Sequence, residues 1–340
     1  MTYNWQHPHW PNFTYDGAQC KTTVYQYALE AGRLSGMVGQ MAENVQYDIY
    51  IDLMACEAQH SSAIEGEQLN SDDIQATIRN SLGLNHPTVE VNNPRAEGIS
   101  RLMVDVRKTF GQPLCEQKLL QWQQMVTSGL LDEQGNPQYA PGQWRESAQP
   151  PRIVAVEDGV ETINFIAPLA DDITQQIGQF IDWYNRTNPM ENPSAENTLS
   201  GPVRAAIAHL WFESIHPFEH GNGRVGRAIA EQALAQDLGH PPMLSLSMQM
   251  KKYTSAYYRE LNNATGDTMD ITPWVKGGQN GFPATDTHRQ QTHVFLYLDM
   301  CKTRFSLRCA QLNSRLYLVK GAKICVRLVI ILTLIIFAKY

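Results

Sequence analysis

The sequence has few cysteines, and none of them is placed to bind zinc. The chain of 340 residues contains no CxxC pair and no group of Cys and His at zinc-like spacing. Its six cysteines are Cys20, Cys56, Cys115, Cys301, Cys309 and Cys325. Free, buried thiols are the simplest interpretation. A zinc ribbon and a disulfide-stapled small fold are therefore excluded, and a large hydrophobic core must supply the stability.

A secretion signal and a long apolar run are also missing. The start, MTYNWQHPHWPNF, has no basic residues followed by an apolar stretch, so the reducing cytoplasm is the expected compartment. The apolar run LVIILTLIIFA at residues 328–338 has only eleven residues, whereas a membrane-spanning helix needs about 20. We therefore do not expect this tail to contact a membrane.

Positive charge is scarce over most of the chain. The sequence has 27 Lys and Arg against 34 Asp and Glu, a net charge of −7, and no direct binding of nucleic acid is predicted. Residues 301–340 differ, because they hold eight basic residues and no acidic one. This change, the crowding of cysteines and the loss of helical pattern suggest that the text after about residue 276 is read out of frame. A buried helix and a surface-anchoring segment are the alternatives.

Helical periodicity dominates the rest of the sequence. A stretch rich in Pro and β-branched residues interrupts it, and the runs 152–156 and 162–166 around EDGV predict one β-hairpin. The expected fold is mostly α with this single hairpin. The predicted helical segments are 20–78 with a turn at Gly32 to Gly36, 94–110, 116–128, 171–184, 203–214, 222–238 and 251–263.

One segment, HPFEHGNGRVGR at residues 216–227, has a composition that packing does not explain. Its GNG stands at the expected start of a helix, where free backbone N–H groups and the helix dipole bind anions. Arg224 and Arg227 lie one turn apart on one face and can both bind phosphate oxygens. His216 comes just before and can take a proton from an attacking hydroxyl. The segment thus predicts a phosphate site beside a base, and it matches neither a P-loop nor a dinucleotide-binding fingerprint.

This segment resembles the signature of the Fic family, HxFx[D/E]GNGRxxR. The resemblance implies a helical core that moves the nucleotide part of a triphosphate, commonly AMP from ATP, onto a protein hydroxyl. His216 would be the general base, and Phe218 the buried anchor of the loop. The glycines and asparagine would hold the α- and β-phosphates, and the arginines the β- and γ-phosphates. The implied phosphate-binding residues are Gly221, Asn222, Gly223, Arg224 and Arg227.

One position departs from the family signature. The acidic residue that binds Mg²⁺ in the family is here His220, and Glu219 occupies the variable position before it. Imidazole is a poor ligand for Mg²⁺ and suits Mn²⁺, Zn²⁺ or no metal better. The identity of a metal, Mg²⁺ or Mn²⁺, therefore stays open.

A second resemblance lies upstream, in SSAIEG at residues 61–66. It is similar to the inhibitory motif [S/T]xxxE[G/N] of some Fic proteins, in which the glutamate pairs with the second arginine of the signature and blocks the γ-phosphate. Here Glu65 would face Arg227, and ATP and Glu65 would compete for one guanidinium.

Two further assignments follow from the resemblance. Residues 141–168 resemble the family's flap, which aligns a target segment by strand addition, although a plain hairpin that closes the core is the alternative. Tyr257 and Tyr258 could flank the adenine, or belong to the core. The resemblance covers about residues 1–275 and leaves a homodimer as a possible assembly.

The predicted organisation has three parts. Residues 1–90 form a helical module that carries the inhibitory motif, 91–275 form the Fic core, and 276–340 form the atypical tail. The expected function is protein adenylyl transfer from ATP to a Ser, Thr or Tyr hydroxyl of a target protein, with inhibition by Glu65. The alternatives are a Fic-fold transferase with another phosphate-containing donor, and a catalytically weak nucleotide-binding regulator.

Overall fold

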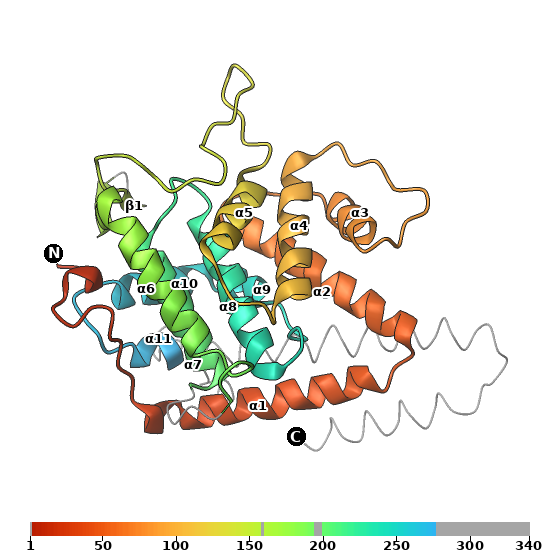
Figure 1. The fold of residues 1–340 in the computed structure, drawn as a ribbon, viewed down its shortest axis with the longest axis horizontal. Coiled ribbons are helices and arrows are strands. Elements are labelled where there is room, and N and C mark those ends of the chain that lie inside the picture. Colours follow the sequence, from red (N-terminus) through yellow and green to blue (C-terminus); the bar gives the residue numbers. More distant parts are fainter. Residues whose placement is uncertain (1, 158–159, 194–198, 277–340) are drawn as a thin grey trace. The chain divides into compact units, whose positions relative to one another are not determined.

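The computed structural model describes residues 2–157, 160–193 and 199–276. Within these ranges the chain is mostly helical, as the sequence predicts (Figure 1). The chain divides into the units Met1–Tyr297 and Leu298–Tyr340, and the second unit lies outside the described residues, as does the predicted change of reading frame. None of the described helices is long and apolar enough to cross a bilayer. The predicted boundary near residue 90 stays a prediction.

The helices fall close to the predicted segments. Two short 3₁₀ helices, η1 (Asn4–Gln6) and η2 (Ala170–Asp172), accompany them. The α-helices are α1 (Gly17–Gly39), α2 (Glu43–Ile64), α3 (Ser71–Ser81), α4 (Pro94–Thr109), α5 (Glu116–Thr127), α6 (Ile173–Arg186), α7 (Gly201–Ile215), α8 (Asn222–Leu238), α9 (Leu246–Lys252), α10 (Thr254–Ala264) and α11 (Thr272–Lys276).

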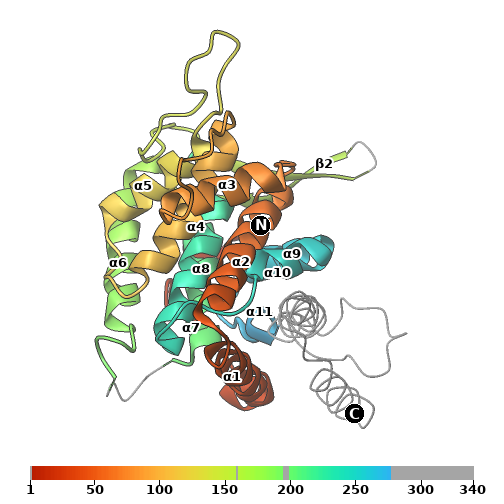
Figure 2. The same cartoon turned by 90° about the vertical axis from the view of Figure 1, so that its right-hand side faces the viewer.

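The core is built around the pair α7 and α8, which pack along one another. Every residue of α7 except Ala206 is buried, as expected of a helix that is apolar on nearly all sides. Helices α2, α4, α5 and α9 contact α8, and Figures 1 and 2 show α8 among α2, α4 and α7. The N-terminus of α8 is thereby brought beside the C-terminus of α2.

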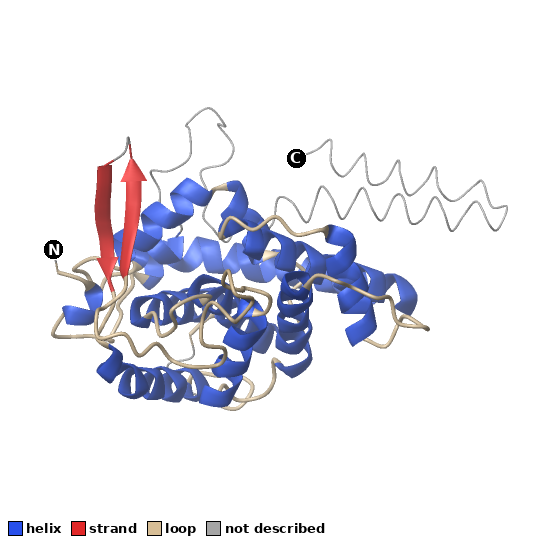
Figure 3. Cartoon of the chain, turned by 90° about the horizontal axis from the view of Figure 1, so that it is seen from above, coloured by secondary structure: helices blue, strands red, loops and turns tan. Residues whose placement is uncertain are grey.

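The predicted hairpin is present. Strands β1 (Arg152–Glu157) and β2 (Val160–Ile166) pair antiparallel, with a bulge between Ile153 and Val154. Figures 2 and 3 show the two strands projecting from the helices. Residues 158–159 of the predicted turn lie outside the described residues.

Aromatic and polar contacts hold the N-terminal segment. The rings of Trp10 and Phe13 lie against Trp211 of α7, each with centroids 6.1 Å away. The Nδ2 of Asn4 donates to Ser214 Oγ at 2.8 Å. These contacts fasten the first residues of the chain to the same helix that leads into the candidate site.

Two details of the helix prediction are wrong. Gly32 and Gly36 do not form a turn, because α1 runs through both of them and ends at Gly39. A glycine inside a helix costs only about 1 kcal/mol, and buried residues of α1 on the other face outweigh that cost. The predicted helix 251–263 is broken at Tyr253, which separates α9 from α10.

The packing of two glycines gives a test of the fold. A Cβ on Gly98 would collide with the backbone oxygen of Met125, whereas a Cβ on Gly36 would meet nothing within 4 Å. We expect Gly98→Ala to lower the free energy of unfolding by about 2 kcal/mol or more, because α4 and α5 must separate. Gly36→Ala should raise it by about 0.5–1 kcal/mol. Urea unfolding of both variants measures the difference, and equal effects would contradict the packing of α4 on α5.

Candidate active site

The loop between α7 and α8 begins with a strained residue. His216 has φ 49° and ψ 60°, and among the described residues it is the one non-glycine with positive φ. Such backbone costs roughly 1–3 kcal/mol and persists where the surroundings impose it, often at functional sites. The loop ends at Gly221, whose φ of 95° suits glycine and which caps the N-terminus of α8.

Two side chains of the signature stiffen the loop from inside. The backbone N–H of Phe218 donates to Asn222 Oδ1 at 2.9 Å, and Asn222 Nδ2 donates back to the Phe218 carbonyl at 2.8 Å. The Phe218 ring is fully buried and stacks on Trp144, with centroids 4.9 Å apart. Phe218 thus occupies the anchoring position that the resemblance implies, while the Asn222 side chain holds the loop.

Arg145 ties the loop to the end of the hairpin. Its Nε donates to the His216 carbonyl at 2.7 Å, and its Nη2 donates to the Pro168 carbonyl at 2.6 Å. The side chain is 2% exposed, and burial lowers the pKa of Arg145 to about 10. Its guanidinium still carries its charge at neutral pH and fixes the backbone of His216 relative to the residues that follow β2.

The His216 imidazole is neutral and reachable. Burial, reinforced by the nearby charge of Arg145, lowers the pKa of His216 to about 4. The side chain remains 18% exposed, so a substrate can contact it. Its Nδ1 is buried 3.9 Å from the carboxylate of Glu213 and has no hydrogen-bond partner. A neutral imidazole that leaves Nε2 for the substrate is suited to accept a proton.

Glu213 of α7 lies between His209 of the same helix and His216, which follows the end of that helix. Its carboxylate is 3.9 Å from His209 Nε2 on one side and 3.9 Å from His216 Nδ1 on the other. Burial raises the pKa of Glu213 to about 8, despite the opposing charge of Arg227. Gly226 of α8 permits this arrangement, because a Cβ there would meet Glu213 Oε1 at 2.6 Å.

The N-terminus of α8 is covered by a carboxylate from α2. A Cβ on Gly223 would collide with Glu65 Oε1, so the carboxylate lies directly against this first turn. Helix N-termini favour negative charge through their free N–H groups and their dipole. Burial alone would raise the pKa of Glu65, but the charge of Arg227 and its hydrogen bond lower it. Glu65 therefore stands, ionised, in a place suited to phosphate.

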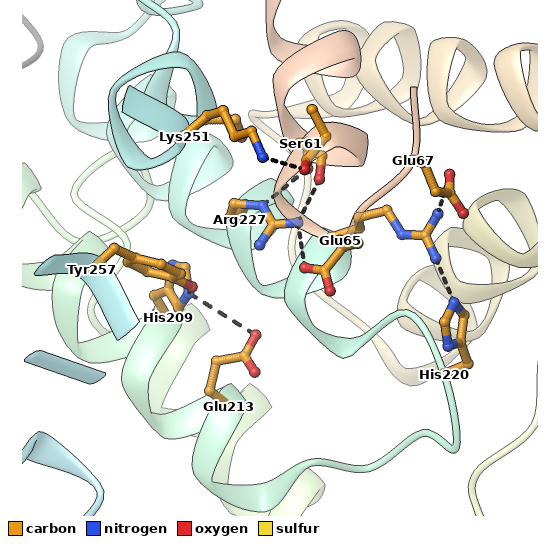
Figure 4. Close-up of polar contacts among 12 residues, drawn as sticks. Ser61, Glu65, Glu67, His209, Glu213, His220, Arg227, Lys251 and Tyr257 are labelled. Carbon is orange, nitrogen blue, oxygen red and sulfur yellow. Dashed lines mark hydrogen bonds and ion pairs between the residues drawn. The ribbon is translucent and has the colours of Figure 1, made fainter. Parts of the chain in front are cut away.

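Arg227 is held by the end of α2. Its Nη2 donates to Glu65 Oε1 at 2.8 Å and to the Ser61 carbonyl at 2.9 Å, and its Nε donates to Ser61 Oγ at 3.0 Å (Figure 4). The guanidinium is 1% exposed, whereas the Glu65 side chain is 30% exposed. Burial alone would lower the pKa of Arg227, but Glu65 raises it. The carboxylate is thus the solvent-facing partner of a buried cation.

Arg224 is held by a second carboxylate and by His220. Its Nη1 lies 3.1 Å from Glu67 Oε2, and its Nη2 lies 2.8 Å from His220 Nε2. Glu67 also forms an ion pair with Arg95 of α4. Figure 4 shows Glu67 and His220 on the side of Glu65 away from Arg227. Two glutamates, two residues apart, therefore engage both signature arginines.

The family's divalent cation does not fit these residues. Burial and the adjacent charge of Arg224 lower the pKa of His220 to about 4, so the imidazole is neutral and its Nε2 accepts from Arg224. A hard cation prefers carboxylate oxygens to a nitrogen already bound to a guanidinium. Over the described ranges, no group of three or more His, Cys, Asp and Glu side chains is placed to hold a metal ion.

The structure brings the predicted site residues together at the α7–α8 junction, with Glu65 beside Arg227. Sequence reasoning missed Arg145, Glu67 and Arg95. Glu67 had a signal, since it follows Glu65 by two residues. Arg145 lies within the predicted flap but was given no role there, and Arg95 lies outside any motif that we recognised. Of the two tyrosines, Tyr257 is 2% exposed and its hydroxyl bonds His209 at 3.0 Å, whereas Tyr258 is 38% exposed. Of these two tyrosines, only Tyr258 is exposed enough for an adenine ring to stack on it.

Comparison with known families agrees with this geometry. The model of the Fic/DOC family matches residues 113–234, which include the hairpin, α7 and most of α8. This segment of the chain is a Fic domain. Residues 3–84 of the chain match a second model, a domain of unknown function called DUF4172.

Curated relatives are similar over the Fic domain. A protein adenylyltransferase Fic of Culex quinquefasciatus is 32% identical over 112 residues, which are 33% of this chain and 19% of that protein. Protein adenylyltransferase fic-1 of Caenorhabditis briggsae is 27% identical over 110 residues, 32% of this chain and 19% of that protein. The matched segment thus spans about a fifth of these relatives.

Solved structures share the fold over a larger part of the chain. A Fic family protein from Desulfovibrio desulfuricans G20 has a TM-score of 0.55 and 23% identity, and the match covers 78% of this chain and 72% of that one. A Fic domain-containing signaling protein from Bacteroides thetaiotaomicron VPI-5482 has a TM-score of 0.51 and 16% identity, covering 81% of this chain and 93% of that one.

The contacts of Arg145 generate a prediction for the loop. We expect Arg145→Gln to lower the free energy of unfolding by about 3 kcal/mol, because buried carbonyls lose their charged donor. Arg152→Gln, on an exposed residue of β1, is the control and should change it by less than about 0.5 kcal/mol. Urea unfolding measures both values. An Arg145 variant as stable as the control would contradict the role of this side chain in holding the loop.

Proposed function

We propose that this Fic protein is a protein adenylyltransferase that moves AMP from ATP onto a Ser, Thr or Tyr hydroxyl of a target protein. The observation that carries the proposal is a neutral, reachable His216 fixed beside a helix N-terminus with two arginines. The names of the curated relatives support the same activity. The Fic domain itself indicates a transferase.

The proposed reaction is a displacement at the α-phosphorus. The target hydroxyl forms a bond to the α-phosphorus while its proton passes to His216 Nε2. The bond from the α-phosphorus to the bridging oxygen of the β-phosphate breaks, and pyrophosphate leaves. The N–H groups at the start of α8 and the guanidiniums of Arg224 and Arg227 stabilise the charge that gathers on the phosphate oxygens. Most of the catalytic effect would come from positioning, since the loop is rigid before the substrate arrives.

The proposed regulation is competition for the same groups. Glu65 lies against Gly223 and binds Arg227, so a polyphosphate cannot reach either while the carboxylate stays. Because Glu65 is the more exposed partner, it can leave without exposing the buried guanidinium, provided that an anion takes its place. Relief of the autoinhibition by Glu65 then requires only a displacement of the end of α2.

The proposed target site is the flap at residues 141–168. Ile153, Val154 and Ile163 of the hairpin are at least 36% exposed, although they are apolar. An extended segment of a target protein can pair with the free edge of a two-stranded sheet through backbone hydrogen bonds. Arg145 and Pro168 would then set the distance from the docked segment to His216.

Two alternatives remain and both keep the nucleotide site. His220 in the cation position favours a nucleotide-binding regulator without transferase activity. A different phosphate-containing donor, such as UTP or CDP-choline, or transfer of a phosphoryl group would use the same base and arginines. A panel of donors labelled at different phosphates separates these alternatives.

The Glu65–Arg227 contact leads to a prediction on activity. We expect Glu65→Gly to increase labelling of protein by α-labelled ATP about tenfold, because a charge-assisted hydrogen bond of roughly 1.5–3 kcal/mol no longer opposes the nucleotide. His216→Ala in that background should reduce labelling by at least about 100-fold. Mass spectrometry of the labelled protein identifies the donor group and the acceptor.

The matched control for this experiment is Glu43→Gly, which removes a glutamate from the other end of α2. It should leave labelling unchanged. No labelling by Glu65→Gly with ATP, with any added metal, would overturn adenylyl transfer, and equal labelling by both glycine variants would overturn inhibition by Glu65.

The lowered pKa of His216 predicts the pH dependence of the reaction. The base must be neutral to accept a proton, and its pKa of about 4 keeps it neutral at pH 5 and above. Initial rates of Glu65→Gly at saturating ATP should therefore change little from pH 8 to 5.5 and fall about tenfold per pH unit below pH 4. A half-maximal rate near pH 6.5, the ordinary value for histidine, would contradict a buried base.

A further inference from the structure

Three arginines meet near the N-terminus of α8, and only two of them belong to the Fic signature. The third is Arg95, at the start of α4, whose stem packs against Gly129 and whose side chain is 34% exposed. Arg95 and Arg224 share one partner, because each binds a different oxygen of Glu67. An oxygen-rich anion in the place of that carboxylate would therefore contact both guanidiniums.

His220 prepares Arg224 for such an anion. The imidazole stacks on Tyr139, with centroids 4.6 Å apart and an interplanar angle of 6°. With its ring so held, His220 Nε2 accepts from Arg224 Nη2 at 2.8 Å. The Arg224 guanidinium is thereby bound to the residue that stands where the family signature has its cation ligand. A divalent cation bound to this nitrogen would lie against a positive charge.

Two carboxylates already show what the arginines hold. Glu65 and Glu67, two residues apart, bring two anionic groups to Arg227 on one side and to Arg224 and Arg95 on the other. Two neighbouring phosphates of a polyphosphate are likewise adjacent anionic groups, and the oxygens of each accept hydrogen bonds from charged donors. The three guanidiniums supply those donors from the protein itself.

We propose that Arg95, with Arg224 and Arg227, replaces the divalent cation in binding the polyphosphate of the nucleotide, and that His220 is a positioning residue that fixes Arg224. The preferred ligand is thus a nucleoside triphosphate free of metal. This inference rests on the proposed nucleotide-binding function. Because a bound Mg²⁺ neutralises two negative charges of ATP, it weakens the electrostatic attraction between the nucleotide and the three arginines.

Calorimetric titration with ATP tests the proposal without requiring catalysis. The protein is the full chain with Glu65→Gly and Glu67→Gln, which frees the arginines. We expect the Kd for ATP in EDTA to equal that in excess MgCl₂ or to be lower. A Kd at least tenfold lower in MgCl₂ would overturn the replacement of the cation.

Arg95 is tested in the same background, so that its loss does not act through Glu67. Arg95→Gln should raise the Kd in EDTA about tenfold, and Arg95→Lys should restore part of the affinity. Arg101→Gln removes an exposed arginine of the same helix, which pairs with Glu97, and should leave the Kd unchanged. Equal Kd values for the Arg95→Gln and Arg101→Gln variants would overturn the role of Arg95.

His220→Asp tests the positioning residue. It restores the acid of the family signature, and we expect MgCl₂ then to lower the Kd at least tenfold while the affinity in EDTA falls. A variant that binds as tightly in EDTA as its parent would overturn the role of His220, with the melting temperature showing that it is folded. ATP binding in EDTA without any transfer would leave this inference standing and refute adenylyl transfer. Adenylyl transfer combined with ATP binding that depends on Mg²⁺ would support the proposed function and refute this inference.

Discussion

The buried guanidinium of Arg227 joins two parts of the chain that lie 162 residues apart. A charge in this position must be paired, because an uncompensated buried cation costs several kcal/mol. Ser61 and Glu65 supply the pairing, and Lys251 binds the Ala63 carbonyl at 2.7 Å and so holds the same end of α2 from another side. The end of α2 is therefore a structural part of the site. The proposed inhibition would need no separate domain, because the carboxylate that pairs with Arg227 also lies where we propose that phosphate binds.

The contacts that hold the α7–α8 loop likewise have two roles, one in the fold and one in the candidate site. The left-handed backbone of His216 is an unfavourable conformation that the contacts of Arg145, Asn222 and Phe218 maintain. With the backbone fixed in this way, the imidazole needs little reorganisation on substrate binding. Burial, which maintains the fold, also keeps the base neutral. The stability of the loop and the proposed reactivity of His216 thus depend on the same contacts.

Local sequence patterns predicted the elements and the signature, and the structure explains where they stopped. The mostly helical fold and the hairpin followed from periodicity, yet Gly32 and Gly36 misled because tertiary packing holds α1 together across both. The partners Glu65 and Arg227 were found since each belongs to a motif with fixed spacing. Arg145 and Arg95 had no such spacing, because their roles depend on carbonyls and carboxylates brought close only by folding. A side chain whose partners are distant in sequence produces no pattern of spacing that can be recognised in the sequence.

The bulge in the hairpin bears on how a target would be chosen. Between Ile153 and Val154 the register of β1 shifts by one residue, and side chains of a paired strand alternate between its two faces. In a target segment that paired with this hairpin as proposed, neighbouring side chains would point to opposite faces. Two adjacent hydroxyl residues of one target would not be equivalent acceptors, since they would lie on opposite faces of the added strand. The choice of acceptor would then depend on whether the hydroxyl residue stands at an odd or an even position of the paired strand, as well as on the residues next to it.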